Sequence, residues 1–377
     1  MSALTGATRG GDADLLAWVR LSYSPGIGPL AVQRLLREFG PPQQVLARDA
    51  RSLQRVLRPA VAAALLGAPP PALRELLARA PDWLAEPGQR LLHLGDPLYP
   101  RRLLQTADPP PLLWARGDVD LLHRSRLLAM VGTRHPSASG RRDARELAQA
   151  LASCAITVVS GLARGIDTQA HRGALLASDG GSTVAVLGTG CDRVYPSEQI
   201  ELAGEIRRRG LLLSEFALGA SPLPHHFPQR NRVISGLCDG VLVTEAALHS
   251  GSLITARMAA EQGREVFAMP GSIHNPMARG CHALLRDGAG LVEGVEDILR
   301  EMAWQAPRRP PARATPLPGA QARRVLDCLG AQDLGFDTLR QRCGLATDVL
   351  NEVLLELESL GLVARLAGGR LQAGGGE

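Results

Sequence analysis

Short apolar runs alternate with amphipathic segments through the middle of the chain, between residues 86 and 304. The amphipathic segments carry apolar residues at the spacing of a helix that covers a core on one side. Strands that alternate with helices in this way form a parallel sheet with helices on both faces. The predicted strands are Leu127–Val131, Ile156–Ser160, Thr183–Leu187, Leu211–Ser214, Gly240–Thr244 and Glu265–Met269.

The two ends of the chain follow other patterns. Residues 1–85 place apolar residues at helical spacing between proline-rich breaks, which predicts a small helical domain of the SAM or helix-hairpin-helix type. Residues 305–320, QAPRRPPARATPLPGA, are typical of a stiff, extended linker. Residues 321–377 resemble a winged-helix domain, with predicted helices at Ala322–Leu329, Thr338–Cys343 and Thr347–Leu360 and a hairpin at Val363–Gln372 that turns at Gly368-Gly369.

These patterns together predict an α/β protein. We expect an extended Rossmann-like parallel sheet over residues 86–304, flanked by the N-terminal helical domain and the C-terminal winged helix. One turn in the helical domain, Ser24–Pro29, contains the sequence PGIG before a helix-like segment. It resembles a helix-hairpin-helix, whose backbone amides can contact a phosphate. It is equally typical of a capping turn in a small bundle, and both interpretations stay open.

The composition narrows the class of protein. Of the 377 residues, 45% are hydrophobic and 21% charged, which indicates a soluble globular protein of two or three domains. No apolar run is long enough to cross a bilayer, and the first residues lack a signal pattern, so we expect a cytoplasmic protein with no membrane partner. The six cysteines include no CxxC pair, which favours reduced thiols over disulfides or a zinc site.

The charged residues exclude some chemistry. Every one of the 42 basic side chains is arginine. Because a Walker A loop and a Schiff base both need lysine, P-loop ATPase chemistry and Schiff-base chemistry are excluded. The net charge of +5 is only weak evidence for nucleic acid. Residues 86–304 contain 23 arginines and 23 carboxylates, so a nucleic-acid site on the core must be a local patch.

Glycine-rich turns follow four of the predicted strands, at Gly132–Arg134, Ser160–Asp167, Gly188–Arg193 and Ser250–Ser252. Glycine lets the backbone approach a ligand closely, and a helix that begins after such a turn offers unpaired N–H groups to an anion. Tight strand-to-helix turns also need glycine for geometry alone. That explanation does not account for Arg134, Arg164 and Arg193, whose side chains suit phosphate. We therefore expect an anion-binding crevice at the carboxyl ends of the strands.

Familiar enzyme signatures are missing from the sequence. The first turn reads GTRHPSASG rather than GxGxxG, and the second strand ends in Ser160-Gly161 where a ribose-binding carboxylate would be expected. The sequence contains no HExxH and no GxSxG motif. We interpret His225-His226 as surface or nucleic-acid-facing residues whose side chains point apart. We expect no catalytic residue, no cofactor and no metal.

A second basic segment follows the histidine pair. In FPQRNRVISG, Arg230 and Arg232 flank Asn231 at the start of a predicted helix, an arrangement that can hold a phosphodiester backbone. An alternative is that one of the two arginines ties this loop to the sheet through a carboxylate such as Glu215 or Glu245. We expect both, with at least one of the arginines structural.

Six motifs, in this order, resemble the DprA/Smf family of DNA-processing proteins: GTR, SGLARGID, GTGCDRVYP, SEFALGASPLPHHFPQRNRVISGL, VLVTEAALHSGSLITARMAAEQGREVFAMPG and GCHALLRDGA. The resemblance covers about residues 15–304 strongly. It implies a Rossmann-like core that binds single-stranded DNA, forms a homodimer and recruits the RecA recombinase during natural transformation. Single-strand-binding protein is a further implied partner. The resemblance implies neither a cofactor nor catalytic turnover.

The resemblance also implies particular residues. The arginine of the first motif is a principal DNA contact in the family, and it matches Arg134. A short apolar helix late in the core is implied as a dimer interface, through His282, Leu284 and Leu285. Together with the residue patterns above, the predicted DNA-binding set is Gly132, Thr133, Arg134, Gly161, Arg164, Gly188, Thr189, Arg193, Phe227, Arg230, Asn231 and Arg232.

One departure and two alternatives remain. Family members often carry a basic residue and an Asn after the YP pair, whereas Tyr195-Pro196 is followed here by SEQ, so Arg193 is the candidate for the missing charge. A nucleotide-phosphate glycosidase of the lysine-decarboxylase-like type also has glycine-rich strand ends, but SGSLIT lacks the glutamate that it needs. A scaffold whose crevice binds nothing is the other alternative. Because Thr347–Leu360 carries four acidic and no basic residues, we expect that the winged helix does not read DNA through this helix.

Overall fold

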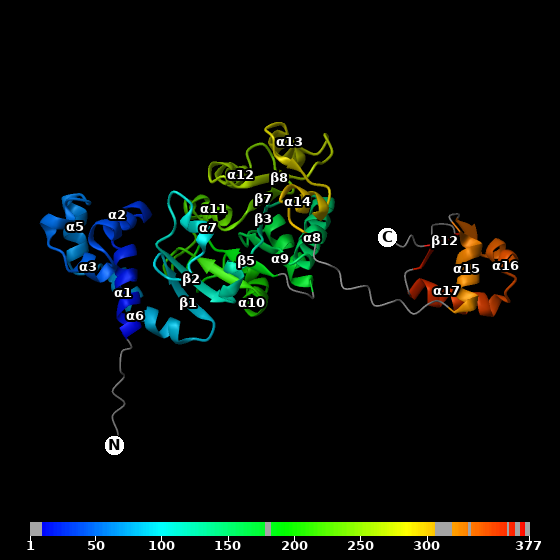
Figure 1. Cartoon of the computed structure of the whole chain (residues 1–377), viewed down its shortest axis with the longest axis horizontal. Coiled ribbons are helices and arrows are strands. Elements are labelled where there is room, and N and C mark those ends of the chain that lie inside the picture. The colour runs from blue at the N-terminus through cyan, green and yellow to red at the C-terminus, as the bar shows by residue number, and fades with distance from the viewer. Residues whose placement is uncertain are drawn as a thin grey trace, which may run out of the picture. The chain divides into compact units, whose positions relative to one another are not determined.

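The computed structural model describes residues 10–177, 182–305, 319–330, 333–359, 362–365 and 370–373. The chain divides into two compact units, Met1–Ala306 and Pro307–Glu377 (Figure 1). The predicted linker lies largely outside the described residues, as does the predicted hairpin turn at Gly368-Gly369. No helix in the described ranges is long and apolar enough to cross a membrane.

The first unit begins with a group of short helices. Proline stands at the start of four of them, where its fixed φ and missing N–H suit the first helical position. Gly26, with φ +77°, makes the turn between the first two. The helices are α1 (Gly10–Ser22), α2 (Pro29–Phe39), α3 (Pro42–Leu46), α4 (Ala50–Leu53), α5 (Pro59–Leu66) and α6 (Pro71–Ala85).

A nine-stranded sheet forms the centre of the first unit, in the order β1-β2-β6-β5-β4-β3-β7-β8-β9 among the described residues. The strands from β6 to β9 in this order are parallel, and β2 and then β1 extend the sheet antiparallel at the β6 edge. The strands are β1 (Gln89–His93), β2 (Leu112–Gly117), β3 (Leu127–Val131), β4 (Thr157–Ser160), β5 (Thr183–Val186), β6 (Leu211–Ser214), β7 (Gly240–Val243), β8 (Glu265–Ala268) and β9 (Gly290–Leu291).

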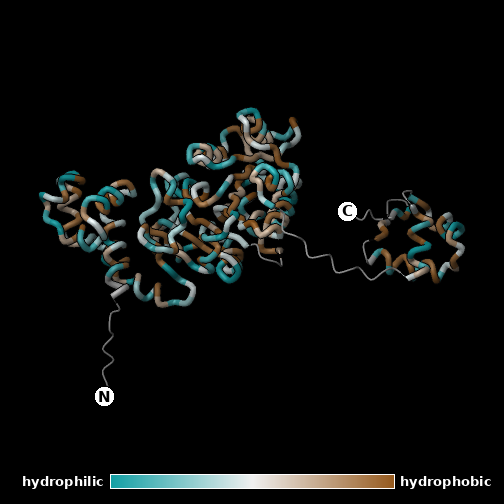
Figure 2. The backbone as a smooth tube through the Cα atoms, in the orientation of Figure 1, coloured by the Kyte–Doolittle hydropathy of each residue, from teal (hydrophilic) through white to brown (hydrophobic). Residues whose placement is uncertain are grey.

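Helices cover both faces of the sheet because its central strands are buried on both sides. In β3, Leu127, Ala129 and Val131 join the apolar cluster on one face, and Leu128 and Met130 join the cluster on the other. Figure 2 shows these apolar strands as brown segments of the tube inside the core. The remaining elements are α7 (Arg101–Leu104), η1 (Val119–His123), α8 (Ala138–Ser153), α9 (Ile166–Leu176), η2 (Ser197–Gln199), α10 (Ile200–Arg209), α11 (His226–Leu237), α12 (Gly251–Glu261), η3 (Pro276–Ala278), α13 (Arg279–Arg286) and α14 (Val295–Glu301).

The N-terminal helices pack on the sheet rather than standing apart from it. Their apolar side chains share one cluster with residues of β1, β2 and α10. The indole N–H of Trp114 donates to the Tyr23 hydroxyl (2.8 Å), which donates to the backbone carbonyl of Glu215 (3.0 Å). The helices therefore belong to the same compact unit as the sheet, and the domain boundary at residue 85 stays a prediction.

The second unit contains three helices and a small sheet within its described residues. The helices are α15 (Ala320–Leu329), α16 (Phe336–Cys343) and α17 (Thr347–Ser359). The strands β10 (Leu334–Gly335), β11 (Val363–Arg365) and β12 (Arg370–Ala373) pair antiparallel in the order β10-β12-β11. This is the expected winged-helix order, and the fold class predicted from the sequence is confirmed for the chain.

Candidate nucleic-acid interface

The site lies where the order of the parallel strands reverses. From β3 the chain adds β4, β5 and β6 on one side and then crosses to add β7 on the other. At such a point the loops after the two central strands separate and leave a crevice at the carboxyl ends. A cavity of about 840 Å³ opens there, and it is lined by the turn after β3, the turn after β4, the start of α11 and the start of α12.

Arg134 is the most accessible cation of this crevice. Its side chain is exposed, and its guanidinium lies 5.7 Å from the centre of the Phe227 ring. In the described part of the chain, no carboxylate forms an ion pair with it. Gly132 lets the turn pack closely, because a Cβ there would stand 2.9 Å from the Glu245 carbonyl oxygen. The turn therefore presents an unpaired arginine beside an aromatic face, which suits a phosphate and a base.

Arg134 also borders a second hollow of about 300 Å³. Arg164 and Arg141 line the same hollow, with the turn that leads into α9. Arg164 forms an ion pair with Glu198, and both side chains are more than half exposed. Arg141, which the sequence analysis did not select, donates to the carbonyl of Pro136 (2.9 Å). Its signal was the basic GRRDAR segment at the start of a helix, directly after the first glycine-rich turn.

The turn after β4 is built around a buried arginine. Arg230 is only 4% exposed, and its guanidinium donates to the carbonyls of Gly161 and Val186. A Cβ on Gly161 would stand 2.6 Å from this guanidinium, so the position requires glycine. Asp167 accepts from the backbone N–H groups of Gly161 (3.1 Å) and Ala163 (3.3 Å). Burial lowers the pKa of Arg230 to about 10 and raises the pKa of Asp167, and each group's charge opposes the shift of the other.

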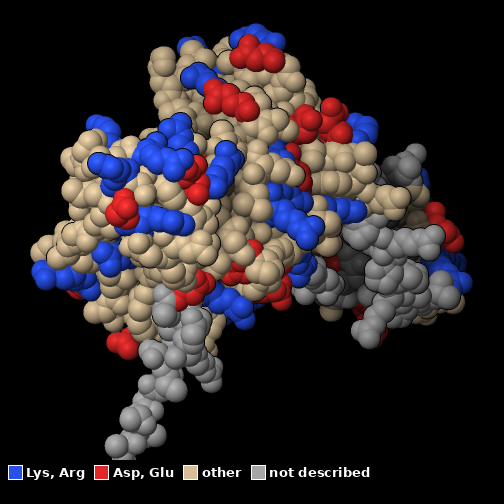
Figure 3. Space-filling model, turned by 60° about the vertical axis from the view of Figure 1, so that its left-hand side comes forward, with Lys and Arg blue, Asp and Glu red and all other residues tan. Residues whose placement is uncertain are grey.

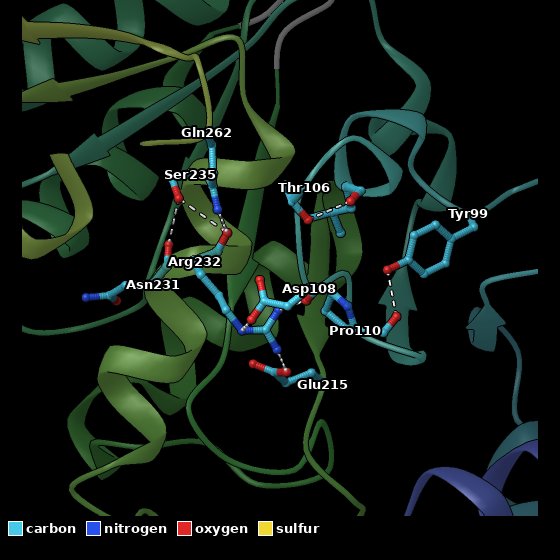
Figure 4. Close-up of polar contacts among 10 residues, drawn as sticks. Tyr99, Thr106, Asp108, Pro110, Glu215, Asn231, Arg232, Ser235 and Gln262 are labelled. Carbon is cyan, nitrogen blue, oxygen red and sulfur yellow. Dashed lines mark hydrogen bonds and ion pairs between the residues drawn. The ribbon is translucent and has the colours of Figure 1, made fainter. Parts of the chain in front are cut away.

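Two of the predicted DNA contacts have internal partners in this structure, and their contact with DNA stays a prediction. Arg230 lines the crevice, but its Nη1 donates to the carbonyls of Gly161 and Val186 and its Nε donates to the side-chain oxygen of Asn231 (3.1 Å). Arg232 is not among the residues that line the cavity, and it forms ion pairs with Glu215 and, at 3.4 Å, with Asp108 (Figure 4). Glu215 is thus the carboxylate that ties this loop to the sheet, as one of the two alternatives predicted. Asn231, between the arginines, does line the cavity.

The turn after β5 contributes less than expected. Thr189 is 2% exposed, and its hydroxyl donates to the carbonyl of Arg193 (2.6 Å), so it supports the turn internally and its contact with DNA stays a prediction. Arg193 is exposed and donates to the Ser221 hydroxyl (3.0 Å), beside a separate hollow against α6. Gly188 leaves room for the side chain of Phe227, because a Cβ at this position would stand 3.0 Å from the aromatic ring.

Two aromatic rings lie together near the crevice. The ring centres of Tyr195 and Phe227 are 5.8 Å apart, and Tyr195 is 48% exposed. Exposed aromatic faces are the usual stacking platforms for the bases of a single strand. His226 faces the other way: it stacks on Phe216 with ring centres 4.0 Å apart, and burial lowers its pKa. Its ring also touches that of His225, so the expectation that the pair points apart is wrong.

Arginine side chains gather in local groups on the face that Figure 3 shows, separated by neutral surface and some acidic residues. This agrees with the expectation that any positively charged site on the core is a local patch. Within the described ranges, no cluster of three or more His, Cys, Asp or Glu could hold a metal ion. The three predicted dimer residues lie on α13, where Leu284 and Leu285 are half-buried against the core and His282 interacts with the Gly271 carbonyl (3.0 Å).

A Rossmann-like sheet with arginines and glycine-rich turns at its switch point, in a chain that also carries a winged helix, defines an α/β protein with a candidate anion-binding crevice. Two family models match the chain, DNA recombination-mediator protein A over residues 90–303 and the DprA winged helix domain over residues 309–369. The chain belongs to this DNA recombination-mediator protein A family, known as DprA or Smf. The resemblance seen in the sequence motifs is confirmed.

Individual relatives agree with the family models. Protein Smf of Escherichia coli is 42% identical over 298 residues, which cover 76% of this chain and 78% of that protein. The solved DprA of Streptococcus pneumoniae superposes with a TM-score of 0.61 at 35% identity, over 77% of this chain and 97% of that one. The Helicobacter pylori DprA structure, described by its single-stranded DNA binding mode, gives a TM-score of 0.52 at 28% identity, over 58% and 98%.

Proposed function

We propose that this protein binds single-stranded DNA in the crevice between β3 and β7, protects incoming strands there and loads RecA onto them. The observation that carries the proposal is Arg134, an exposed arginine without an ion-pair partner among the described residues, held over the Phe227 ring at the switch point. A phosphate on Arg134 leaves the attached base within reach of the aromatic pair Tyr195 and Phe227. The single-strand binding mode described for the Helicobacter pylori relative supports this assignment.

We expect the protein to contact the phosphate backbone of the DNA more than its bases. Arg134 borders both cavities, and Arg141 and Arg164 line the second, so successive phosphates meet arginine along one path. Few aromatic residues stand near this path. Binding is therefore dominated by phosphate contacts, tolerant of sequence and sensitive to salt. No catalytic step is part of the proposal.

A direct comparison of two probes tests the binding. Fluorescence polarisation of a labelled oligothymidine and of a duplex of equal length is measured over a series of salt concentrations. We expect the single strand to bind more tightly, with an affinity that falls steeply as salt rises. Equal affinity for the two probes, or no binding to either, contradicts the proposal. RecA loading is tested separately, by the rate at which RecA nucleates on strands already coated with single-strand-binding protein.

We also predict a homodimer formed through α13. Leu284 is only half-buried against the core of its own chain, so part of its surface remains for a second copy. Light scattering at micromolar concentration is expected to give the mass of two chains for the wild type. Leu284→Glu should give one chain, because a carboxylate at an apolar interface is costly to desolvate. Leu176→Glu is the matched control, since Leu176 on α9 is 49% exposed. A single-chain mass for the wild type contradicts the prediction.

The winged helix is predicted to contribute little to single-strand affinity. Its α17 carries Asp348 and Glu352 on an exposed surface and no basic residue, and carboxylates near a polyanion oppose docking. Residues Met1–Ala306 form a compact unit of their own, so deletion of the remainder leaves the crevice complete. We expect a change in affinity below about threefold at fixed salt, or about 0.7 kcal/mol. A loss of tenfold or more by the truncated chain, with its dimer intact, would show a DNA-binding role for this unit.

A further inference from the structure

A buried carboxylate lies directly behind the Arg134 turn. Glu245 follows β7 and is 7% exposed. Its carboxylate accepts from the backbone N–H of Ser137 (2.9 Å), from the Ser137 hydroxyl (2.6 Å) and from the side-chain amide of Asn275 (3.0 Å). These donors come from two loops that follow different strands, so one carboxylate joins both loops to the end of β7.

The position of this carboxylate is the place where a Rossmann fold usually holds a phosphate. Ser137 is the N-cap of α8, a helix of 16 residues that follows the first parallel strand, β3. In dinucleotide-binding proteins the N-terminus of that helix receives the pyrophosphate, because its N–H groups and dipole attract an anion. Here the chain supplies its own anion. Gly140, in the first turn of α8, makes the room, because a Cβ there would overlap the carboxylate of Glu245.

Glu245 also holds the other end of the same turn. Its backbone carbonyl accepts from the N–H of Thr133 (2.7 Å). Thr133 and Ser137 are thus both anchored to one residue, and only three residues, Arg134 among them, lie between the anchors. A loop fixed at both ends over so short a span has few conformations left, so Arg134 stays beside Phe227 without a ligand present.

We propose that Glu245 is a positioning residue for DNA binding, an internal anion that occupies the phosphate place at the N-terminus of α8 and fixes the Arg134 turn. The proposal rests on the function proposed above. It means that the DNA phosphates meet Arg134 and its neighbouring arginines on the outer side of the turn, while the helix N-terminus behind the turn is closed to them.

Two physical effects of removing Glu245 have opposite signs, which makes the proposal testable. Removing one negative charge near a polyanion site would by itself tighten DNA binding through long-range electrostatics. Loss of the anchor instead frees the turn and adds an ordering cost to each binding event. If Glu245 is a positioning residue, Glu245→Ala weakens single-strand binding although the protein has become more positive.

Chemical rescue separates positioning from general damage to the fold. A cavity of about 230 Å³ adjoins the carboxylate and is lined by Ser137, Glu245 and Asn275, so a small anion can reach the space that Glu245→Ala leaves. Oligothymidine affinity is measured in sodium acetate and in sodium chloride at equal ionic strength. We expect Glu245→Ala to lose about tenfold in chloride, the effect of losing charge-assisted hydrogen bonds, and to regain most of it in acetate. The wild type should not distinguish the two salts.

Three further variants complete the experiment. Glu245→Gln fills the space but removes the negative charge and replaces one acceptor oxygen by an N–H donor, so it should weaken binding without any response to acetate. Asn275→Ala leaves the net charge unchanged and removes one anchor of the carboxylate, so a smaller loss is expected. Glu261→Ala removes an exposed carboxylate on α12 and is the control for charge alone. Thermal unfolding of each variant shows which of them are folded.

The outcomes distinguish this inference from the proposed function. If the wild type does not bind the oligonucleotide, the proposed function fails. If the wild type binds and Glu245→Ala binds equally or more tightly, or loses affinity that acetate does not restore, the positioning role of Glu245 is overturned and the proposed function stands. If Glu245→Ala does not fold, the test rests on Glu245→Gln and Asn275→Ala. Oligonucleotide affinity equal to that of the wild type in both of these variants overturns the positioning role of Glu245.

Discussion

Arg134→Ala is expected to lower the affinity for single-stranded DNA by tenfold or more, about 1.4 kcal/mol, without unfolding the protein. The side chain is exposed and stands over Phe227 at 5.7 Å, so its removal costs a phosphate contact and a cation–π contact but no internal support. The slope of log affinity against log salt should become shallower by about 0.7, the effect of one phosphate contact on a single strand. Polarisation titrations at several salt concentrations measure both quantities.

A matched variant makes this result specific. Arg142 lies on α8 with its side chain 66% exposed, paired with Asp143 at 3.3 Å. Arg142→Ala removes the same charge a short distance from the turn and should change affinity much less. Arg134→Lys keeps the charge but loses the fork-shaped donor pair, so an intermediate loss is expected. If Arg134→Ala leaves both affinity and salt slope unchanged, Arg134 is not part of the DNA site.

The fold could be predicted from the sequence where the pattern is local. The six strands of the predicted core appear in the structure with ends that differ by at most a residue, because most of them are buried apolar runs bounded by turn residues. The two antiparallel strands β1 and β2 were not predicted. Their segment is interrupted by prolines, and β2 pairs with β6 from almost a hundred residues further along the chain, so nothing in the local pattern marks the pairing.

The site could be predicted as a place but not as a set of contacts. Residue type alone could not separate Arg134 from Arg230 and Arg232, because the difference lies in distant partners. Arg230 is engaged by carbonyls of two other strand ends, and Arg232 by Glu215. Glu245 was considered only as a partner for these arginines, whereas it binds Ser137 across the switch point. Such contacts depend on the three-dimensional arrangement of the loops, which sequence spacing does not contain.

The buried pair of Arg232 and Glu215 has the largest expected effect on stability. The side chain of Arg232 is 11% exposed and that of Glu215 6%, and Asp108 completes the group at 3.4 Å (Figure 4). Arg232 also donates to the carbonyl of Asp108, which joins the segment before β2 to α11. Removing one member of a buried pair leaves the other charge desolvated without compensation.

We expect Arg232→Ala to lower the free energy of unfolding by about 3–5 kcal/mol at alkaline pH, where Glu215 is ionised. Urea unfolding followed by circular dichroism measures it. The control is Arg300→Ala, because Arg300 is 74% exposed in its pair with Asp297 and such pairs contribute less than about 1 kcal/mol. A double variant, Arg232→Met with Glu215→Leu, removes both charges and should recover most of the loss. A cost for Arg232→Ala no larger than that of Arg300→Ala contradicts the interpretation.

The loss caused by Arg232→Ala should also depend on pH, in a direction that Glu215 determines. Burial raises the pKa of Glu215 to about 7, and the charge of Arg232 opposes this shift. A carboxyl whose pKa is raised by folding contributes most to stability when it is protonated, and that contribution falls as pH rises through the folded pKa. Without Arg232 the pKa of Glu215 rises further, so Glu215 takes up a proton and the buried charge disappears already at neutral pH. The stability difference between the variant and the wild type should therefore shrink as the solution is acidified, and a difference that grows toward acid pH would assign the effect to a group other than Glu215.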